Sequence, residues 1–169
     1  MIRSLRFIEA STSGNTEYVV DQVVATLTER MPGLAIERQR AELTHPEDLL
    51  RGDLVILGCG TWNTGGTEGQ LNVHMDALLR ERANGLDLRG RPMTFISLGD
   101  DRYYFRTRCT EHFLRFQREH NGTLFAPPLV IVNEPYGQEE RIRHWAEVLL
   151  KRMTVSPVTL TVDGGRLAA

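Results

Sequence analysis

The sequence predicts an α/β fold in which one parallel sheet lies between two layers of helices. Apolar, strand-like segments alternate with amphipathic, helix-like segments five times along the 169-residue chain. The segment 53–60 is an apolar run closed by glycines, as in a strand that is buried on both faces of a parallel sheet. Because crossovers between parallel strands are almost always right-handed, this alternation predicts helices on both faces of the sheet.

The composition is typical of a globular protein, with 41% hydrophobic and 25% charged residues. A chain of this length can bury its own core, so we expect one domain over 1–153 and assign no role to the tail 154–169. The formal net charge is −2 and Lys151 is the only lysine, which favours neither a nucleic-acid-binding protein nor an acidic disordered chain. Two cysteines are too few for a disulfide framework or a zinc site. The sequence has no signal-peptide pattern and no apolar run near the roughly 20 residues of a membrane span, so we expect a cytoplasmic protein without a membrane partner.

The first part of the chain predicts three strands and a long helix. Val20, Val23 and Leu27 repeat at helical spacing, and the breaker pair Pro32-Gly33 follows them. The segment 34–40 ends in charged residues, which is typical of an edge strand. In chain order we expect a strand at 5–10, a helix from about 15 to 31, the edge strand at 34–40, one helical turn near 45–48 and a central strand at 53–60.

The second part of the chain predicts two strands and three helices. Glycine and threonine dominate 61–69, which is therefore predicted to be a loop. The next helix is expected to use Leu71, Met75, Leu78 and Leu79 as its inner stripe. In chain order we then expect a strand at 93–98, a polar loop at 99–104, a helix from about 107, a strand at 124–132 bent at Pro127-Pro128, and a helix at 138–153. A short β-like run at 158–162 has no assigned role.

An anion-binding loop is predicted where the first strand gives way to the first helix. This stretch is Ser11-Thr12-Ser13-Gly14-Asn15-Thr16 and contains no charged side chain. Its hydroxyls and backbone N–H groups would face an anion at the positive end of the helix dipole. An ordinary capped helix start is the alternative interpretation of the same residues.

Two aromatic-bearing segments follow other strands of the predicted sheet. Trp62 lies in the glycine-rich segment 61–69, and Tyr103 lies in 99–104. In a doubly wound sheet the ligand binds outside the carboxyl ends of the strands, so the three loops should meet in one crevice. They predict a pocket for a flat ligand with a phosphate group. Taken alone, Trp62 could instead be a core aromatic, and Tyr104 competes with Tyr103 for the ligand face.

These three segments resemble those of the flavodoxin family. Residues 11–17, Ser-Thr-Ser-Gly-Asn-Thr-Glu, resemble its phosphate loop. Thr61-Trp62-Asn63 and Gly99-Asp100 with Tyr103 resemble the two segments whose aromatic residues cover the flavin. The resemblance extends over roughly 2–152, and the absence of a long insertion in the fifth strand makes the chain similar to short-chain flavodoxins. It implies a flavodoxin-like three-layer α/β/α sandwich, with a five-stranded parallel sheet in the order 2-1-3-4-5, and a monomer that binds FMN.

The resemblance also implies roles for individual residues. Ser11, Thr12, Ser13, Gly14, Asn15 and Thr16 would hold the FMN phosphate. Trp62 and Tyr103 would cover the two faces of the ring, with backbone groups of Thr61, Asn63, Gly99 and Asp100 near its pyrimidine edge and N5, and Gly65 in the same cofactor-binding set. The peptide after Trp62 would turn over on one-electron reduction, for which Asn63 offers backbone freedom. No catalytic residue and no metal ligand is expected.

The implied function is an electron carrier rather than an enzyme, shuttling single electrons between redox enzymes through a stabilised semiquinone. Its redox partner proteins would dock transiently near the flavin edge. Arg102, Arg106 and Arg108 lie beside the 99–104 loop, which predicts a hydroquinone couple less negative than the family norm. The arginines of 102–118 are interpreted as a solvated helix face, and a docking patch for the partner protein is the alternative interpretation. Two alternatives remain at this point: an FMN-dependent NAD(P)H:quinone or nitro reductase, and a flavin-free interaction module on the same fold.

Overall fold

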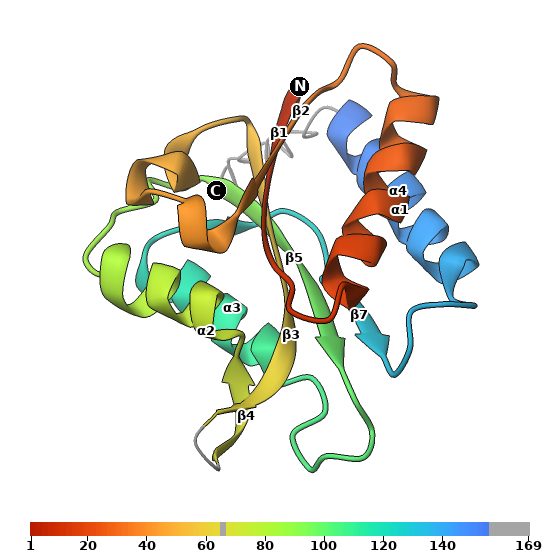
Figure 1. Cartoon of the computed structure of the whole chain (residues 1–169). Helices are drawn as coiled ribbons and strands as arrows, with labels where there is room; N and C mark the ends of the chain where they lie inside the picture. The colour runs from red at the N-terminus through yellow and green to blue at the C-terminus, as the bar shows by residue number, and fades with distance from the viewer. Residues whose placement is uncertain (65–66, 156–169) are drawn as a thin grey trace, which may run out of the picture.

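A twisted sheet forms the middle layer of the molecule (Figure 1). The computed structural model describes residues 1–64 and 67–155. Within these residues the sheet has seven strands, with the path β2-β1-β3-β5-β6, β4 paired to β3 and β7 paired to β5. The strands are β1 (Ser4–Ala10), β2 (Ala35–Arg40), β3 (Leu54–Thr64), β4 (Thr67–Leu71), β5 (Pro92–Gly99), β6 (Thr123–Leu124) and β7 (Leu129–Val132).

The predicted strand order is confirmed. β2, β1, β3 and β5 are neighbours in parallel register, and β6 and β7 both pair in parallel with β5 as two pieces of the last predicted strand. The break falls at Pro127-Pro128, where proline has no N–H to give to the ladder. β2 lies at the sheet edge and β3 lies in the centre, as their charged and apolar sequences predicted.

The prediction of a loop at 61–69 was wrong. β3 continues past Gly60 to Thr64, and the chain returns as β4 in antiparallel register. Glycine and threonine gave this segment the composition of a loop, but threonine is also a good strand former, and an antiparallel hairpin needs only a short turn. Leu71 consequently ends β4 instead of opening the next helix.

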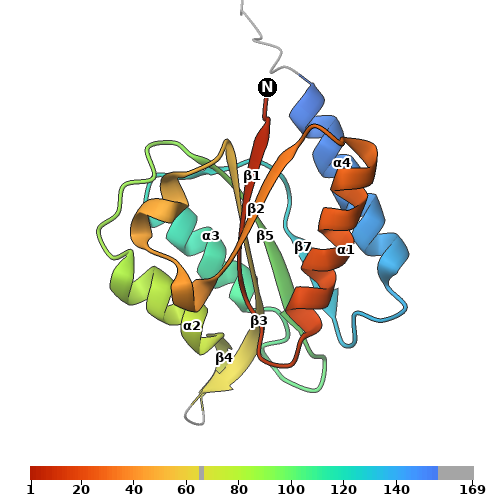
Figure 2. The ribbon, with the colours of Figure 1, turned by 45° about the horizontal axis from the view of Figure 1, so that its top comes forward.

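Helices cover both faces of the sheet. Figures 1 and 2 show α1 and α4 together on one face and α2 and α3 on the other. They are α1 (Asn15–Arg30), α2 (Val73–Asp76) continued by the π-helical segment η3 (Ala77–Arg82), α3 (Cys109–Glu119) and α4 (Glu139–Thr154). Two apolar clusters fill the two interfaces, one around Phe7, Val23 and Ile142 and the other around Ile8, Met75 and Phe113. The β-like run at 158–162 and most of the tail lie outside the described residues.

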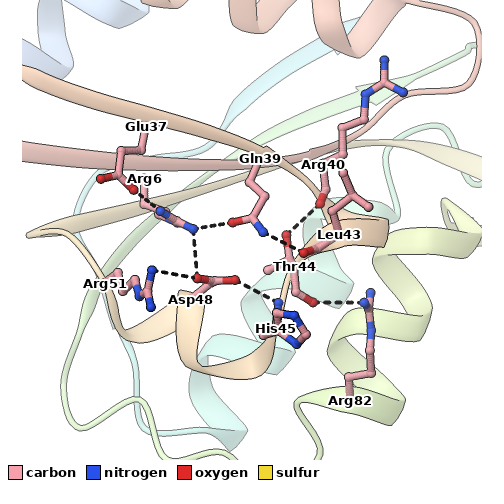
Figure 3. Close-up of polar contacts among 10 residues, drawn as sticks. All are labelled: Arg6, Glu37, Gln39, Arg40, Leu43, Thr44, His45, Asp48, Arg51 and Arg82. Atoms are coloured by element: carbon pink, nitrogen blue, oxygen red, sulfur yellow. Dashed lines mark hydrogen bonds and ion pairs between the residues drawn. The ribbon is translucent and has the colours of Figure 1, made fainter.

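A buried polar network fixes the connection between β2 and β3 (Figure 3). This connection holds two short 3₁₀ helices, η1 (Ala41–Leu43) and η2 (Pro46–Leu50). The guanidinium of Arg6 on β1 pairs with the carboxylate of Asp48 at 3.0 Å and also contacts Glu37 and Gln39. Asp48 accepts the His45 N–H at 2.9 Å, which caps η2. The network therefore ties a surface connection to the strand that leads into the predicted anion loop.

Arg82 of η3 holds the same connection from the other side. Its guanidinium donates to the carbonyl oxygens of Ala41 at 2.7 Å and of Thr44 at 3.0 Å. The Ala41 carbonyl also accepts the N–H of Thr44 at 3.2 Å, and Thr44 directly follows η1, so Arg82 binds the carbonyls at both ends of this short helix. One arginine thus joins η1 to the helical layer formed by α2 and η3.

Candidate functional site

A cleft of about 710 Å³ opens at the carboxyl ends of β1, β3 and β5. This volume is within the roughly 300–1,000 Å³ of typical small-molecule sites. The cleft is bordered by ten of the thirteen residues that the sequence nominated: Thr12, Ser13, Asn15, Thr16, Thr61, Trp62, Asn63, Gly99, Asp100 and Tyr103. The three predicted segments therefore meet in one crevice. Ser11 and Gly14 lie beside it without lining it, and Gly65 lies outside the described residues.

The 11–16 loop presents unused backbone donors at the start of α1. Gly14 immediately precedes the helix with φ +90°, a conformation that costs glycine little. The hydroxyl of Ser11 accepts the N–H of Glu17 at 3.4 Å, so Ser11 satisfies one backbone N–H in the first turn of α1. Among the described residues, no acceptor receives the backbone N–H groups of 13–16. Such a helix start is a site for an anion.

Asn72 supports the hydroxyl of Thr12 and was not identified from the sequence. It is 1% exposed and precedes α2, where its Oδ1 accepts the N–H of His74 at 3.0 Å. Its Nδ2 donates to Thr12 Oγ1 at 2.9 Å, which leaves the hydroxyl proton of Thr12 free to point into the cleft. An asparagine just before a helix is a capping signal, but nothing local in the sequence connects it to residue 12.

The hairpin of β3 and β4 carries Trp62 and Asn63 to the cleft. Trp62 is 37% exposed, which is unusual for a tryptophan that merely fills a core. Thr61 Oγ1 accepts the N–H of Cys109 at 3.2 Å, which ties the base of the hairpin to α3. The pairing is irregular between Trp62 and Thr64, so Asn63 lies in a bulged part of the ladder.

The 99–104 segment folds tightly over the end of β5. A Cβ atom at Gly99 would lie 1.6 Å from the carbonyl oxygen of Arg106, so the returning chain leaves no room for a side chain there. Tyr103 is 42% exposed and borders the cleft, whereas Tyr104 is 86% exposed and does not. This arrangement supports Tyr103 over Tyr104 as the ligand-facing residue.

Asp100 forms an ion pair with Arg102 inside the same segment. The guanidinium donates to both carboxylate oxygens, with Nε at 2.9 Å from each. These hydrogen bonds lower the pKa of Asp100 to about 2. Arg102 is therefore neutralised locally, and Arg108 lies 3.7 Å from Glu111. The positive charge beside the cleft is smaller than a count of arginines in the sequence indicates.

The end of β7 forms a fourth wall that the sequence did not reveal. Asn133 adopts a left-handed conformation, with φ +68°, and exchanges two hydrogen bonds of 3.0 Å with Asp101. Glu134 Oε2 lies 3.3 Å from Asn15 Nδ2, so one carboxylate faces the anion loop. An Asn-Glu pair after a strand is too common to indicate a site. Only the pairing of β7 with β5 brings these two residues to the cleft.

Charges near the strand ends are compensated. Glu9 is 8% exposed. The guanidinium of Arg38 lies 2.7 Å from the Glu9 carboxylate and 2.6 Å from the Asp21 carboxylate, and so bridges the two. Burial raises the pKa of Glu9 in spite of this partner. Asp53 lies at the other end of β1, where it accepts the N–H groups of Arg3 and Ser4. The carboxylates of Glu9 and Asp53 therefore lie at opposite ends of β1 and do not share one acidic pocket.

Cys59 and Cys109 are both buried. The thiol of Cys109 donates to the carbonyl of Cys59 at 3.3 Å, and burial raises the pKa of Cys59. Residues 1–64 and 67–155 contain no cluster of histidine, cysteine and acidic side chains suited to a metal ion. Within the same ranges, every helix is too short or too polar to cross a bilayer.

The flavodoxin family model matches residues 8–145, most of the chain. The chain belongs to the flavodoxin family. Flavodoxins are electron-transfer flavoproteins rather than enzymes; they bind a flavin, typically FMN, and pass electrons to redox partner proteins. Membership therefore assigns this chain an electron-transfer role in general terms and confirms the resemblance inferred from its three segments.

Individual flavodoxins agree with this assignment. The probable flavodoxin 2 of Bacillus subtilis is 27% identical over 134 residues, which cover 79% of this chain and 84% of that protein. Oxidised flavodoxin 2 from Bacillus cereus has a similar fold, with a TM-score of 0.78 at 24% identity over 88% of this chain and 99% of that one. Oxidised flavodoxin 1 from the same organism has a TM-score of 0.77 at 21% identity, over 90% of this chain and 99% of that one. A short-chain flavodoxin associated with a bacterial microcompartment has a TM-score of 0.74 at 22% identity, over 89% of this chain and 98% of that one.

Proposed function

We propose that this flavodoxin binds FMN in the described cleft and carries one electron at a time between redox enzymes, through a stabilised semiquinone. The observation that carries the proposal is the set of unused N–H donors at 13–16, which open into the same cleft as two partly exposed aromatic side chains. An anion site beside aromatic surfaces suits a ligand that has both a phosphate and a flat ring.

The loop residues fit a phosphate monoester. Backbone donors at a helix start bind anions without a cationic side chain, and the loop contains none. Thr12 and Ser13, which both carry hydroxyls, line the cleft, and Thr16 lines it from the first turn of α1. Ser11 would take part only if it released the N–H of Glu17. We therefore assign the main contacts to 12–16.

The other two walls fit an isoalloxazine ring. We assign Trp62 and Tyr103 to its two faces, where aromatic stacking contributes about 0.5–1.5 kcal/mol per pair beyond burial. Backbone groups of Thr61, Asn63, Gly99 and Asp100 would bind its polar edge. The bound flavin supplies the redox chemistry, and the protein supplies orientation and electrostatics.

The cleft is open to solvent, which suits a carrier whose partner proteins must approach the ring edge. Two covered ring faces would leave little room for a nicotinamide, which argues against the reductase alternative. We further propose that the chain functions as a monomer that docks transiently on its redox partners.

The test is a stepwise dithionite titration of the purified protein with FMN, followed by visible absorption. We expect FMN to bind stoichiometrically, riboflavin to bind more weakly because it lacks the phosphate, and reduction to pass through a half-reduced species. A single two-electron step would contradict the proposed carrier. Direct bleaching by NADPH without a reductase would support the reductase alternative, and a protein that binds no flavin would support the interaction module.

A further inference from the structure

His112 lies behind the hairpin, outside the cleft, and has both ring nitrogens engaged. It is on α3 and is 8% exposed. Its Nε2 lies 2.8 Å from the carbonyl oxygen of Gly69 on β4. Its Nδ1 lies 2.8 Å from Arg115 Nη2 and 3.3 Å from Arg80 Nη2. A helix-borne histidine without metal-ligand companions thus joins three separate parts of the chain.

These partners determine the protonation state of the ring. A carbonyl oxygen can only accept a hydrogen bond, so Nε2 must carry a proton. Guanidinium groups can only donate, so Nδ1 must be unprotonated. His112 is therefore neutral. Burial and the nearby charges of Arg80, Arg115 and Arg108 lower its pKa below the ordinary 6.5.

Two acidic groups nearby are paired with arginines, and one of these arginines, Arg80, also contacts His112. Asp76 pairs with Arg80 at 2.9 Å, and Glu111 lies 3.7 Å from Arg108. Glu119 borders the same small surface cavity as His112, and Glu68 precedes Gly69 on β4. Neither is paired with the ring. Protonation of Nδ1 would thus remove an acceptor shared by two guanidiniums.

The carbonyl that His112 holds belongs to the bulge opposite Asn63. Trp62 pairs with Gln70 and Thr64 pairs with Thr67, so β4 has two residues, Glu68 and Gly69, where β3 has only Asn63. Gly69 has φ +77°, and a Cβ there would lie 2.8 Å from side-chain atoms of Phe105 and Arg108. Such a bulge re-aims the neighbouring chain and must be held in place to do so.

We propose that His112 is a positioning residue for the flavin ring: through the Gly69 carbonyl it fixes the β4 side of the hairpin, so that Trp62 and Asn63 meet the ring in a defined orientation. This inference rests on the proposed function, because it takes the ring to lie against the hairpin. It extends the binding determinants to a side chain that does not touch the ligand. The anchored strand holds its shape while the Asn63 peptide opposite remains free to rearrange.

Two substitutions test the roles of the two ring nitrogens of His112 separately. His112→Gln places an amide N–H near the position of Nε2 and can still reach Gly69, whereas His112→Asn retains an acceptor near Nδ1 but is too short for Gly69. We first compare amide hydrogen exchange of Gln70 and Leu71 in the flavin-free proteins. Faster exchange is expected in His112→Asn and near-native exchange in His112→Gln; equal exchange in all three proteins would overturn the anchor.

The second measurement compares riboflavin and FMN affinities by fluorescence quenching. Losing one hydrogen bond that orders the hairpin should weaken riboflavin binding about two- to tenfold in His112→Asn, with partial or full recovery in His112→Gln. The FMN to riboflavin affinity ratio should stay at the wild-type value, because the phosphate loop is untouched. A changed ratio, or unchanged riboflavin binding in His112→Asn, would overturn the positioning role.

A pH series completes the test. Riboflavin affinity of the wild type should fall as the pH drops through the lowered pKa of His112, because a protonated ring places a positive charge against Arg80 and Arg115 and is repelled from its position against the Gly69 carbonyl. His112→Gln should not show this fall, and the same fall in both proteins would overturn the inference. Failure of the proposed function would look different: the wild type itself would bind neither flavin.

Discussion

Replacing Arg6 with methionine should destabilise the fold without weakening the flavin site. Arg6 is 7% exposed, and Asp48, its partner at 3.0 Å, is 6% exposed. Methionine fills much of the space of the aliphatic stem but leaves the Asp48 carboxylate without its closest cation. Removing one partner of a buried ion pair typically costs about 3–5 kcal/mol of unfolding free energy.

The remaining partners of Asp48 reduce this cost. Arg51 lies 3.5 Å from the same carboxylate oxygen, and the His45 N–H still donates to the other at 2.9 Å. Glu37 is largely exposed and returns to water without penalty. We therefore expect Arg6→Met to lower the free energy of unfolding by about 2–3 kcal/mol, at or below the lower limit of that range.

Urea denaturation of four proteins tests this reasoning: wild type, Arg6→Met, Asp48→Asn and the double variant. With a slope of about 1–3 kcal/mol/M, the urea midpoint of Arg6→Met should fall by about 0.7–3 M. The double variant should recover at least about 1 kcal/mol relative to the sum of the single changes, because the unpaired charge is gone. Strict additivity would refute the account. FMN affinity should stay within about twofold, since the pair lies away from the cleft.

Three further outcomes follow from the site and the sheet. Asn63→Val should bind FMN but give less semiquinone in a redox titration, because a β-branched residue stiffens the peptide expected to turn over; an unchanged yield would count against that turnover. Glu134→Gln should tighten FMN binding by up to about fivefold, since an exposed charge pair contributes at most about 1 kcal/mol, and riboflavin affinity is the control. Hydrogen bonds from Arg3 and Ser4 lower the pKa of Asp53 below 3.8, so its stabilisation is complete above that pH and is lost as the pH falls through the lowered value. Asp53→Asn should therefore reduce thermal stability near neutral pH but not in strong acid, and an equal loss at both would contradict this assignment.

The sequence was sufficient to predict a parallel α/β sheet with its edge and central strands and three walls of the cleft, and the resemblance to flavodoxins supplied the strand order. Apolar runs such as 54–57 identify buried strands, and the carboxyl ends of parallel strands necessarily meet at one edge. The sequence was insufficient where the position of a residue depends on contacts with residues far away in the chain. Asp48 meets Arg6 across the fold, and Asn133 reaches the cleft only because β7 lies beside β5.

Short, polar elements were also missed for physical reasons. β4 has five residues of loop-like composition, and its stability comes from pairing with β3 and from the His112 contact. Asn72 has a local capping role, and its bond to Thr12 depends on the hairpin returning the chain to the first loop. Local propensity does not encode such contacts, because both partners must first be placed by the sheet.

Gly99 and Gly14 impose different limits on how this sequence can diverge. At Gly14 the backbone angle is the constraint, and an added Cβ would meet nothing within 4 Å. Asparagine, which tolerates left-handed angles, is therefore an acceptable replacement there. At Gly99 the constraint is volume, because the Arg106 carbonyl lies where any Cβ would be. Even alanine at 99 would require the segment bearing Tyr103 to follow another path, so a relative with a side chain at this position would need a differently built wall around the ring.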